Sequence, residues 1–308
     1  MITRRFLFWF LAEILILGVV GVLIWRIEIA GFPAGRIAVW LFAGYILVRV
    51  LHIAGEFVLS FFWRTPRSEE NRLGVVGTIH MVLTEIGVCL MIMLLLRPFA
   101  RVFMARRRPF IIRAGQRPVI LVHGYAANSG IWAPMMQYLI RRGVTNLFTI
   151  DLEPRFGDID DYARQLAARV TRICNTTRAD KVVLVAHSMG GLVARAYIEQ
   201  FGGAQRVAKL ICIGTPHHGA VMARLAPGVN ASQMRVGSAW LGDMNRDENY
   251  RNEIPYVSVY SAHDNVVFPQ NSAEFGKARN LEVVGRGHFT LLVSREVGRL
   301  LYREITTL

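Results

Sequence analysis

The sequence predicts an α/β protein with a mostly parallel sheet of about six strands flanked by helices, preceded by a bundle of about three transmembrane helices. Two observations predict this arrangement. From Arg117 onward, short apolar runs alternate with helical patterns, which is typical of a parallel sheet covered on both faces. Before residue 100, Leu, Ile, Val, Phe and Trp dominate in long apolar runs.

The apolar runs cover residues 6–25, 37–63 and 75–96. Each reaches the roughly 20 residues that a helix needs to cross the hydrocarbon of a bilayer. A secretory signal is the alternative for the first run, because Arg4 and Arg5 precede it. That run is long, however, contains Glu13 and ends without a small-residue cleavage site. We therefore predict that residues 1–110 form a transmembrane region that ends in a basic juxtamembrane linker.

Ionisable residues interrupt these apolar runs. Arg49, His52 and Glu56 are spaced so that they share one face of the second predicted helix. Charged groups at membrane depth are costly and usually face other helices or water. We expect them to pair with one another, for example Glu13 or Glu85 with Arg49. A transport path, or a groove that feeds lipid to the rest of the protein, is the alternative.

The basic residues predict a membrane location rather than nucleic-acid binding. The formal net charge is +14, and the densest cluster, Arg106–Arg108, follows an apolar segment. This placement favours anionic lipid headgroups, and no nucleic-acid-binding motif accompanies the charge. The positive-inside rule prefers a topology with the arginines of residues 97–117, together with Arg26 and Arg36, inside. We expect a multi-pass protein of a bacterial-type inner (plasma) membrane whose C-terminal domain is cytoplasmic.

The C-terminal part is predicted to fold as one α/β domain over residues 111–308, with a short cap insertion at residues 217–253. Strands are expected at residues 118–123, 146–151, 181–187, 207–214, 254–261 and 281–285. Helices are expected at residues 158–177, 189–201 and 290–306. In open parallel sheets, ligands bind beyond the carboxyl ends of the strands, so the functional residues are expected there.

A tight turn follows the third predicted strand. The stretch Ala186–Gly191 reads Ala-His-Ser-Met-Gly-Gly and comes directly after an apolar run. Small residues at Ala186 and Gly190 let the strand and the next helix approach each other, and the turn forces Ser188 into a strained backbone conformation. The serine hydroxyl then projects from the end of the sheet, ahead of a helix N-terminus. This pattern predicts a nucleophilic serine.

An acid and a base follow this serine in the chain. Asp264 comes after the penultimate strand, and His288 comes after the last strand. A histidine at this position can take the serine proton, and a carboxylate beside it can hold the imidazole tautomer. His187 is too close to Ser188 in sequence for the role of base, and His263 adjoins the acid. The alternative for Asp264 is an aspartate that caps a turn or a helix.

The loop after the first strand of the α/β domain is expected to supply an oxyanion hole. His123-Gly124-Tyr125 ends that strand, and Gly124 lets the backbone approach a substrate closely. The N–H of Tyr125 and the N–H of Met189, the residue after the serine, would then hold the oxyanion. The alternative is a plain turn from strand to loop.

The cap insertion begins at Gly214-Thr215-Pro216-His217-His218-Gly219. Pro216 and Gly219 would turn the chain out over the site. We expect the substrate to be bound here, by His217, Met222, Leu225 and Trp240. The alternatives are that the apolar residues form ordinary core under a short cap, and that His217 or His218 anchors the loop by hydrogen bonds.

At these residues the chain resembles the small bacterial triacylglycerol lipases of the minimal α/β-hydrolase type. The matching stretches are Val122–Gly124, Ala186–Gly191, Tyr260–Asp264, Ala278–Asn280 and Gly287–Leu292. The resemblance covers roughly residues 118–308 and implies Ser188 as nucleophile, Asp264 and His288 as its partners, and Tyr125 and Met189 as oxyanion donors. Those lipases are secreted and soluble, so the apolar N-terminal region departs from them. The Thr-Pro-His stretch is similar to larger lipases and to lipid-deacylating esterases of the GPI-inositol deacylase kind.

The resemblance implies a serine hydrolase, a lipase or esterase that cleaves carboxylic esters of lipids through an acyl-enzyme on Ser188, and the apolar runs predict that it is anchored in a membrane. Its expected partners are a lipid or acyl-ester substrate and the bilayer, with no nucleic acid. A thioesterase or a short-chain esterase is the alternative. A transport or scaffold protein with a vestigial hydrolase domain is a further alternative, against which the intact set of Ser188, Asp264 and His288 argues.

Neither a metal nor another cofactor is expected. The chain has 3 cysteines, too few for a disulfide framework, and their spacing matches no metal site. We expect Cys89, Cys174 and Cys212 to be free and mostly buried thiols.

Overall fold

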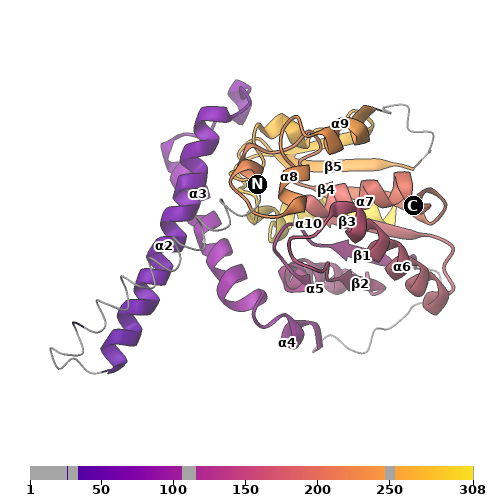
Figure 1. The fold of residues 1–308 in the computed structure, drawn as a ribbon, viewed down its shortest axis with the longest axis horizontal. Coiled ribbons are helices and arrows are strands. Elements are labelled where there is room, and N and C mark those ends of the chain that lie inside the picture. The colour runs from indigo at the N-terminus through magenta and orange to yellow at the C-terminus, as the bar shows by residue number, and fades with distance from the viewer. Residues whose placement is uncertain (1–25, 27–33, 106–115, 247–253, 308) are drawn as a thin grey trace. The chain divides into compact units, whose positions relative to one another are not determined.

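The computed structural model describes residue 26 and residues 34–105, 116–246 and 254–307. The chain divides into two compact units, Met1–Glu56 and Phe57–Leu308. Helix α2 (Ala34–Trp63) begins in the first unit and ends in the second, which holds the remaining described elements (Figure 1). The first predicted membrane span, residues 6–25, lies outside the described residues.

The second unit is built on a 6-stranded parallel sheet with the strand order β2-β1-β3-β4-β5-β6. The strands are β1 (Val119–Val122), β2 (Leu147–Ile150), β3 (Val182–His187), β4 (Val207–Ile213), β5 (Tyr256–Ser261) and β6 (Ala278–Val283). Each predicted strand is confirmed. Strand β6 begins earlier than predicted because it is an edge strand whose exposed polar residues, such as Arg279 and Asn280, hide it from an apolar pattern.

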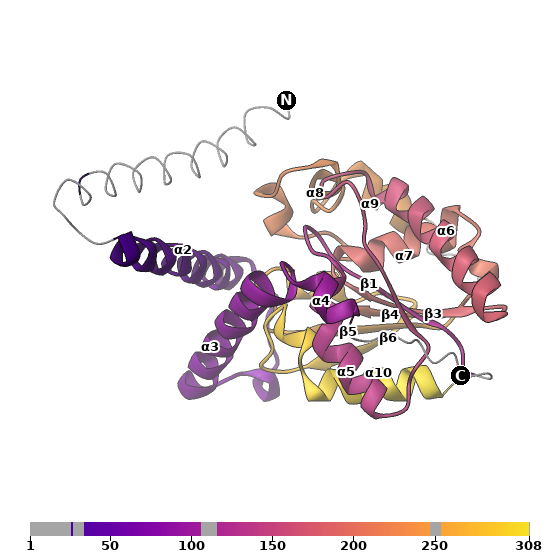
Figure 2. The same cartoon turned by 90° about the horizontal axis from the view of Figure 1, so that it is seen from below.

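Helices cover both faces of the sheet (Figure 2). Helices α6 (Ile159–Thr177) and α7 (Met189–Gln200) lie on one face, and α5 (Ala133–Arg141) and α10 (Arg295–Thr306) lie on the other. The alternation of β1 shows this: Ile120 and Val122 belong to the core under α6 and α7, whereas Val119 and Leu121 belong to the core under α5 and α10. The buried apolar faces of these helices therefore form two core layers.

Two helical segments differ from the prediction. Helix α5 was not predicted, because it is short and carries Pro134 near its start. The helix predicted over residues 290–306 is divided into a 3-10 turn, Thr290–Leu292, and α10. Ser294 separates them, because its side chain accepts a hydrogen bond from the Val297 N–H and caps α10.

The last apolar run also packs into this core. Helix α3 (Val75–Met91) continues through a π-helical segment, Ile92–Leu96, to helix α4 (Ala100–Ala105). The buried residues of this continuous helix are Met81, Glu85, Cys89, Ile92 and Leu96, and their spacing places them on one face. Ile92 and Leu96 join the core under α5 and α10. Over residues 75–96, the exposed large side chains include one ionisable residue, His80, and are otherwise apolar: Val75, Val76, Ile79, Leu83 and Leu95.

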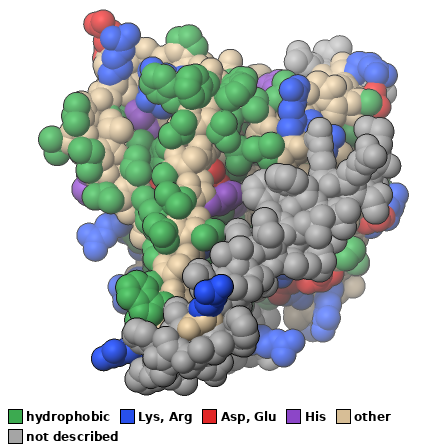
Figure 3. Space-filling view, turned by 60° about the vertical axis from the view of Figure 1, so that its left-hand side comes forward, with side chains coloured by type: hydrophobic (Ala, Val, Ile, Leu, Met, Phe, Trp, Pro, Cys, Tyr) green, Lys and Arg blue, Asp and Glu red, His purple; other side chains and the backbone are tan. Residues whose placement is uncertain are grey.

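Two stretches, Ala38–Trp63 and Val75–Leu96, are long and apolar enough to cross a membrane. Figure 3 shows apolar side chains gathered along helical surfaces on one face of the molecule. The buried stripe from Met81 to Leu96 runs about 22 Å along its helix, at about 1.5 Å per residue. The hydrocarbon of a bilayer is roughly 30 Å thick. The helix of residues 75–96 therefore differs from the predicted span, since protein rather than lipid covers one of its faces for most of its length.

Three ionisable residues of the apolar helices, His52, Glu56 and Glu85, have polar partners nearby. Within α2, His52 Nε2 lies 3.3 Å from a carboxylate oxygen of Glu56. The carboxylate of Glu85 accepts hydrogen bonds from the backbone N–H groups of Phe289 and Thr290. The predicted pairing of Glu85 with Arg49 is therefore not needed to satisfy this carboxylate. The prediction of free, buried cysteines is confirmed.

We expect Leu96→Ala to lower the free energy of unfolding by about 2–5 kcal/mol, because it leaves a cavity in the core. Leu95→Ala is the matched control: Leu95 is 50% exposed, whereas Leu96 is 6% exposed. The control should change this free energy by no more than about 0.5 kcal/mol. Urea denaturation in mild detergent measures both. Equal losses in the two variants would show that this helix is not part of the core.

Candidate active site

Ser188 occupies a strained turn between strand β3 and helix α7. Its φ of 56° and ψ of −129° lie where residues other than glycine are rare. The Ser188 N–H donates a hydrogen bond of 2.9 Å to the Ile213 carbonyl of β4. A Cβ on Gly190 would lie 2.7 Å and 2.6 Å from the carbonyl oxygens of Val122 and His123, so a larger residue cannot be placed there. The neighbouring strands thus hold the turn, and the sequence prediction of strain at Ser188 is confirmed.

The predicted acid and base lie in direct contact. His288 Nδ1 is 2.8 Å from Asp264 Oδ2, and both residues are 2% exposed. Asp264 Oδ1 accepts hydrogen bonds of 2.8 Å from the backbone N–H groups of Val266 and Val267, which fix the carboxylate. Because an ionised carboxylate only accepts, Nδ1 of His288 carries the proton. In the neutral ring, Nε2 is then unprotonated and available as a base.

The backbone of His288 is held at both of its polar groups. Its N–H donates to Asn265 Oδ1 at 3.0 Å, and its carbonyl accepts from His187 Nε2 at 3.2 Å. The rings of His187 and His288 lie 4.5 Å apart. Burial, together with neighbouring His288, holds the pKa of His187 well below its usual range, so His187 is neutral. This supporting role was not predicted; the signal in the sequence is that His187 and Asn265 adjoin predicted site residues.

The loop after β1 lies against Ser188. A Cβ on Gly124 would lie 2.8 Å from the Ser188 Cβ, so only glycine lets this loop come so close. The His123 side chain fixes the loop by two hydrogen bonds. Its Nδ1 donates to the Gly124 carbonyl at 2.8 Å, and its Nε2 accepts the Leu152 N–H at 3.0 Å. Burial lowers the pKa of His123, which agrees with a neutral ring whose Nε2 is an acceptor. This role of His123 was not predicted from the sequence.

The two predicted oxyanion donors border the same turn. Met189 is the first residue of α7, where backbone N–H groups have no partner within the helix. Tyr125 follows Gly124, and its hydroxyl donates to the Pro227 carbonyl at 2.6 Å. The Tyr125 side chain therefore joins the loop to the cap insertion, while its backbone N–H belongs to the loop beside Ser188.

The residues predicted to bind substrate lie in different environments. His217 is fully buried, stacks on Phe275 with ring centroids 4.8 Å apart and lies 3.3 Å from Arg195 Nη1. This placement favours the alternative, that His217 anchors the loop. Trp240 Nε1 donates to both carboxylate oxygens of Asp160 at 3.2 Å, and its ring packs against the core.

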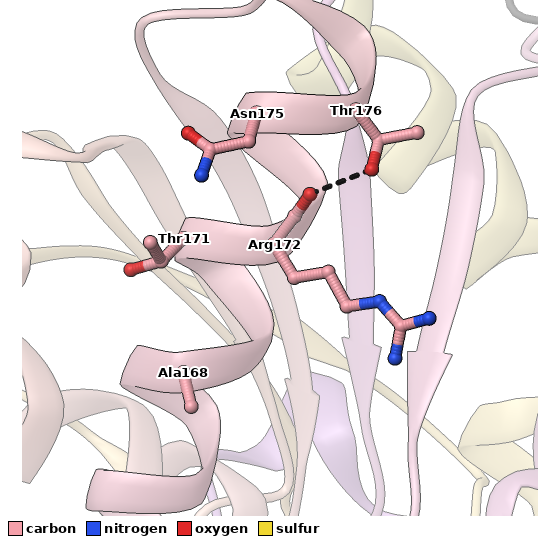
Figure 4. A pocket seen from close by; sticks show the side chains of 5 residues that line it. All are labelled: Ala168, Thr171, Arg172, Asn175 and Thr176. Atoms are coloured by element: carbon pink, nitrogen blue, oxygen red, sulfur yellow. Dashed lines mark hydrogen bonds between the residues drawn. The ribbon is translucent and has the colours of Figure 1, made fainter.

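Met222 is half-buried in a 3-10 turn, Val221–Arg224, and Leu225 is exposed. A surface hollow elsewhere does not involve the site. It lies on the outer side of α6 and is lined by Ala168, Thr171, Arg172, Asn175 and Thr176 (Figure 4). Ser188 itself is 8% exposed, so only a small part of it reaches the surface.

Comparisons with known proteins agree with this geometry. Residues 117–242 match a protein family described as alpha/beta hydrolase fold. This part of the chain therefore has an α/β-hydrolase fold. The chain is 35% identical over 122 residues, 36% of its length, to triacylglycerol lipases of Pseudarthrobacter phenanthrenivorans and Burkholderia plantarii. These residues span only 36% and 32% of the two lipases.

A solved structure, the mature lipase BlEst2 of Bacillus licheniformis, shows the same fold. It superposes with a TM-score of 0.57 at 19% identity, over 63% of this chain and 94% of that one. The predicted fold of the C-terminal part, an α/β-hydrolase with a parallel sheet of 6 strands, is therefore confirmed. The resemblance to bacterial triacylglycerol lipases is confirmed for about a third of the chain.

His263, beside the predicted acid, gives the domain a pH dependence. Its Nδ1 accepts the Gly285 N–H at 3.3 Å. Burial first, and then the positive charges of Arg67 and Arg64, lower the pKa of His263 to about 4. The unfolded chain has the ordinary histidine pKa of about 6.5. Between these two values the unfolded state binds the additional proton, so stability falls as the pH falls.

We expect the free energy of unfolding to decrease as the pH is lowered from about 6.5 to about 4. The variant His263→Asn should lose less over this window, because its amide oxygen can still accept the Gly285 N–H but does not titrate. Urea denaturation of both proteins at several pH values measures the difference. The same pH dependence in the variant and in the wild type would contradict this origin.

Proposed function

We propose that this protein is a membrane-associated serine hydrolase, a lipase or esterase that cleaves carboxylic esters of lipids. The observation that carries the proposal is the hydrogen bond between His288 and Asp264 in an α/β-hydrolase fold whose strained turn presents Ser188. The order serine, aspartate, histidine along the chain is the order of the triad in this fold.

In the proposed acylation step, Ser188 Oγ attacks the carbonyl carbon of the ester while His288 Nε2 takes the hydroxyl proton. The carbonyl oxygen becomes an oxyanion, which the N–H groups of Tyr125 and Met189 stabilise. The intermediate collapses as the bond to the alcohol breaks, and His288 gives its proton to the departing alcohol. Asp264 stabilises the imidazolium that exists between these events, and its own position is fixed by backbone N–H groups.

In the proposed deacylation step, water replaces the alcohol. His288 Nε2 takes a proton from the water as its oxygen attacks the acyl carbon, and the same donors hold the second oxyanion. The bond between the acyl carbon and Ser188 Oγ then breaks, and His288 returns a proton to Ser188. The products are a fatty acid and free enzyme, and no metal or other cofactor takes part in the steps.

Lipid esters are supported as substrates by the surface of the apolar helices. Apart from His80, the exposed large side chains of α3 are apolar, which is unusual for a surface in water and typical of one that meets a membrane or a partner. Binding to a bilayer raises the local concentration of a lipid substrate around the site. The relatives named triacylglycerol lipases support the same class.

We propose a bacterial-type inner (plasma) membrane as the location, with the α/β domain on the cytoplasmic side. The support is the arginine-rich stretch of residues 97–117, which suits the anionic cytoplasmic leaflet. Because α3 packs on the domain along one face, we place the domain against the bilayer surface rather than at the end of an isolated span.

We expect Ser188→Ala to lower the rate of ester hydrolysis by at least about 10⁴-fold, and Asp264→Asn by about 10⁴-fold. Hydrolysis of p-nitrophenyl esters from acetate to palmitate measures these rates and the preferred acyl length. Ser232→Ala, a cap serine whose hydroxyl donates to the Val229 carbonyl, is the control. Unchanged activity of Ser188→Ala would overturn the nucleophile. A maximum at acetate would overturn the lipid substrate, and a preference for acyl thioesters would favour a thioesterase.

The variant Val76→Glu, Ile79→Glu tests the apolar face of α3, because both side chains are exposed and make no part of the proposed triad. We expect kcat/KM to fall by about 10-fold on an ester embedded in anionic vesicles, since apolar burial in the bilayer is lost. Activity on a soluble ester should stay the same. Thr171→Glu, on the outer side of α6, is the control. Unchanged activity on vesicles would show that this face does not meet the membrane.

A further inference from the structure

A buried carboxylate stands in the middle of apolar helix α3. Glu85 is fully buried, and the helix around it, Val75–Met91, is otherwise almost entirely uncharged. Burying a carboxylate is costly unless hydrogen bonds replace its contacts with water. On its own helix, Glu85 contacts Cys89, whose Sγ lies 3.7 Å from Oε1. Its other contacts lie about two hundred residues further along the chain.

The contacts of Glu85 are to the loop that carries the proposed base. Oε1 accepts the Phe289 N–H at 2.8 Å, and Oε2 accepts the Thr290 N–H at 2.9 Å. The Thr290 hydroxyl also donates to Oε2. These donors begin the 3-10 turn Thr290–Leu292, where backbone N–H groups have no partner within the turn. Glu85 therefore fixes the two residues that follow His288.

The residue before His288 is a glycine, which leaves room for this carboxylate. A Cβ on Gly287 would lie 2.4 Å from the Glu85 Cδ and 2.5 Å from Oε2. Only glycine therefore leaves room for the carboxylate. Glu85 thus contacts the chain on both sides of His288, at Gly287 and at Phe289 and Thr290. Other supports of His288 include Asn265, His187 and Asp264, all from the α/β domain.

We propose that Glu85 is a positioning residue for His288, so that apolar helix α3 is part of the catalytic apparatus and not only an attachment to the membrane. This inference rests on the proposed function. His288 must keep Nε2 within reach of Ser188 while Nδ1 stays bonded to Asp264, and a small displacement of its loop disturbs both contacts. Misplacement of a catalytic group by about 1 Å can cost 10²-fold in rate. Glu85 acts through the loop and does not itself touch substrate.

The test compares Glu85→Gln with the wild type, as the full chain in detergent, on a soluble p-nitrophenyl ester. The glutamine keeps the size of the side chain but replaces one acceptor oxygen with an amide that cannot accept the backbone N–H. We expect kcat to fall by about 10- to 100-fold, while KM changes by less than about threefold. Labelling of Ser188 by a fluorophosphonate should slow by a similar factor, since it needs the same base. Glu85→Asp should retain more activity than Glu85→Ala.

Two further variants test the loop without changing Glu85. Thr290→Val removes the hydroxyl donor, and Gly287→Ala pushes against the carboxylate, so both should lower kcat with little change in KM. Their effects should be smaller in the Glu85→Gln background, because residues in one network are not additive. Ile92→Ala, on the same buried stripe of the helix, is the control for a general loss of packing. It should lower stability and keep kcat.

The outcomes separate this inference from the proposed function. A wild type that hydrolyses no ester and reacts with no fluorophosphonate overturns the proposed function itself. An active wild type with a folded Glu85→Gln variant whose kcat lies within twofold overturns the positioning role. If Glu85→Gln does not fold, Thr290→Val and Gly287→Ala decide: wild-type kcat in both overturns the role, and lowered kcat in both supports it. A control that loses kcat as much as Glu85→Gln also overturns it.

Discussion

The backbone strain at Ser188 is the constraint on which the rest of the site depends. A serine with a φ of 56° costs about 1–3 kcal/mol and persists only where the surroundings leave no alternative. Here the carbonyl ends of β1 press against Gly190, and β4 accepts the Ser188 N–H. The close packing of a parallel sheet thus supports a turn that local preferences alone would not form.

Neutral histidines hold the backbone around this turn by hydrogen bonds. His123 and His187 are buried, and burial lowers the pKa of each, so that each ring has one donor and one acceptor nitrogen. His123 joins the loop beside Ser188 to the segment after β2, because Nδ1 donates to the Gly124 carbonyl and Nε2 accepts the Leu152 N–H, and His187 donates to the carbonyl of His288. Charged side chains would carry a large desolvation cost in these places. Two imidazoles therefore position the residues that flank the proposed nucleophile and base.

Helix α3 and the α/β domain are not independent parts. Helix α3 gives one face to the core under α5 and α10 and shows apolar side chains on its exposed surface. The same helix brings Glu85 to the loop of His288. Under the proposed function, this helix places the loop of the proposed base at a fixed depth relative to the bilayer that holds the substrate.

The sequence by itself determined the strands, the turn at Ser188 and the contact between Asp264 and His288, because these depend on local patterns and on their order along the chain. Strand β6 began earlier than predicted, because an edge strand with polar residues lacks the apolar signal. Only the tertiary structure decided which face of the helix of residues 75–96 packs against the protein core. A helix face that meets a core and one that meets a bilayer have the same apolar composition. It alone decided the partner of Glu85, because that contact joins segments about two hundred residues apart.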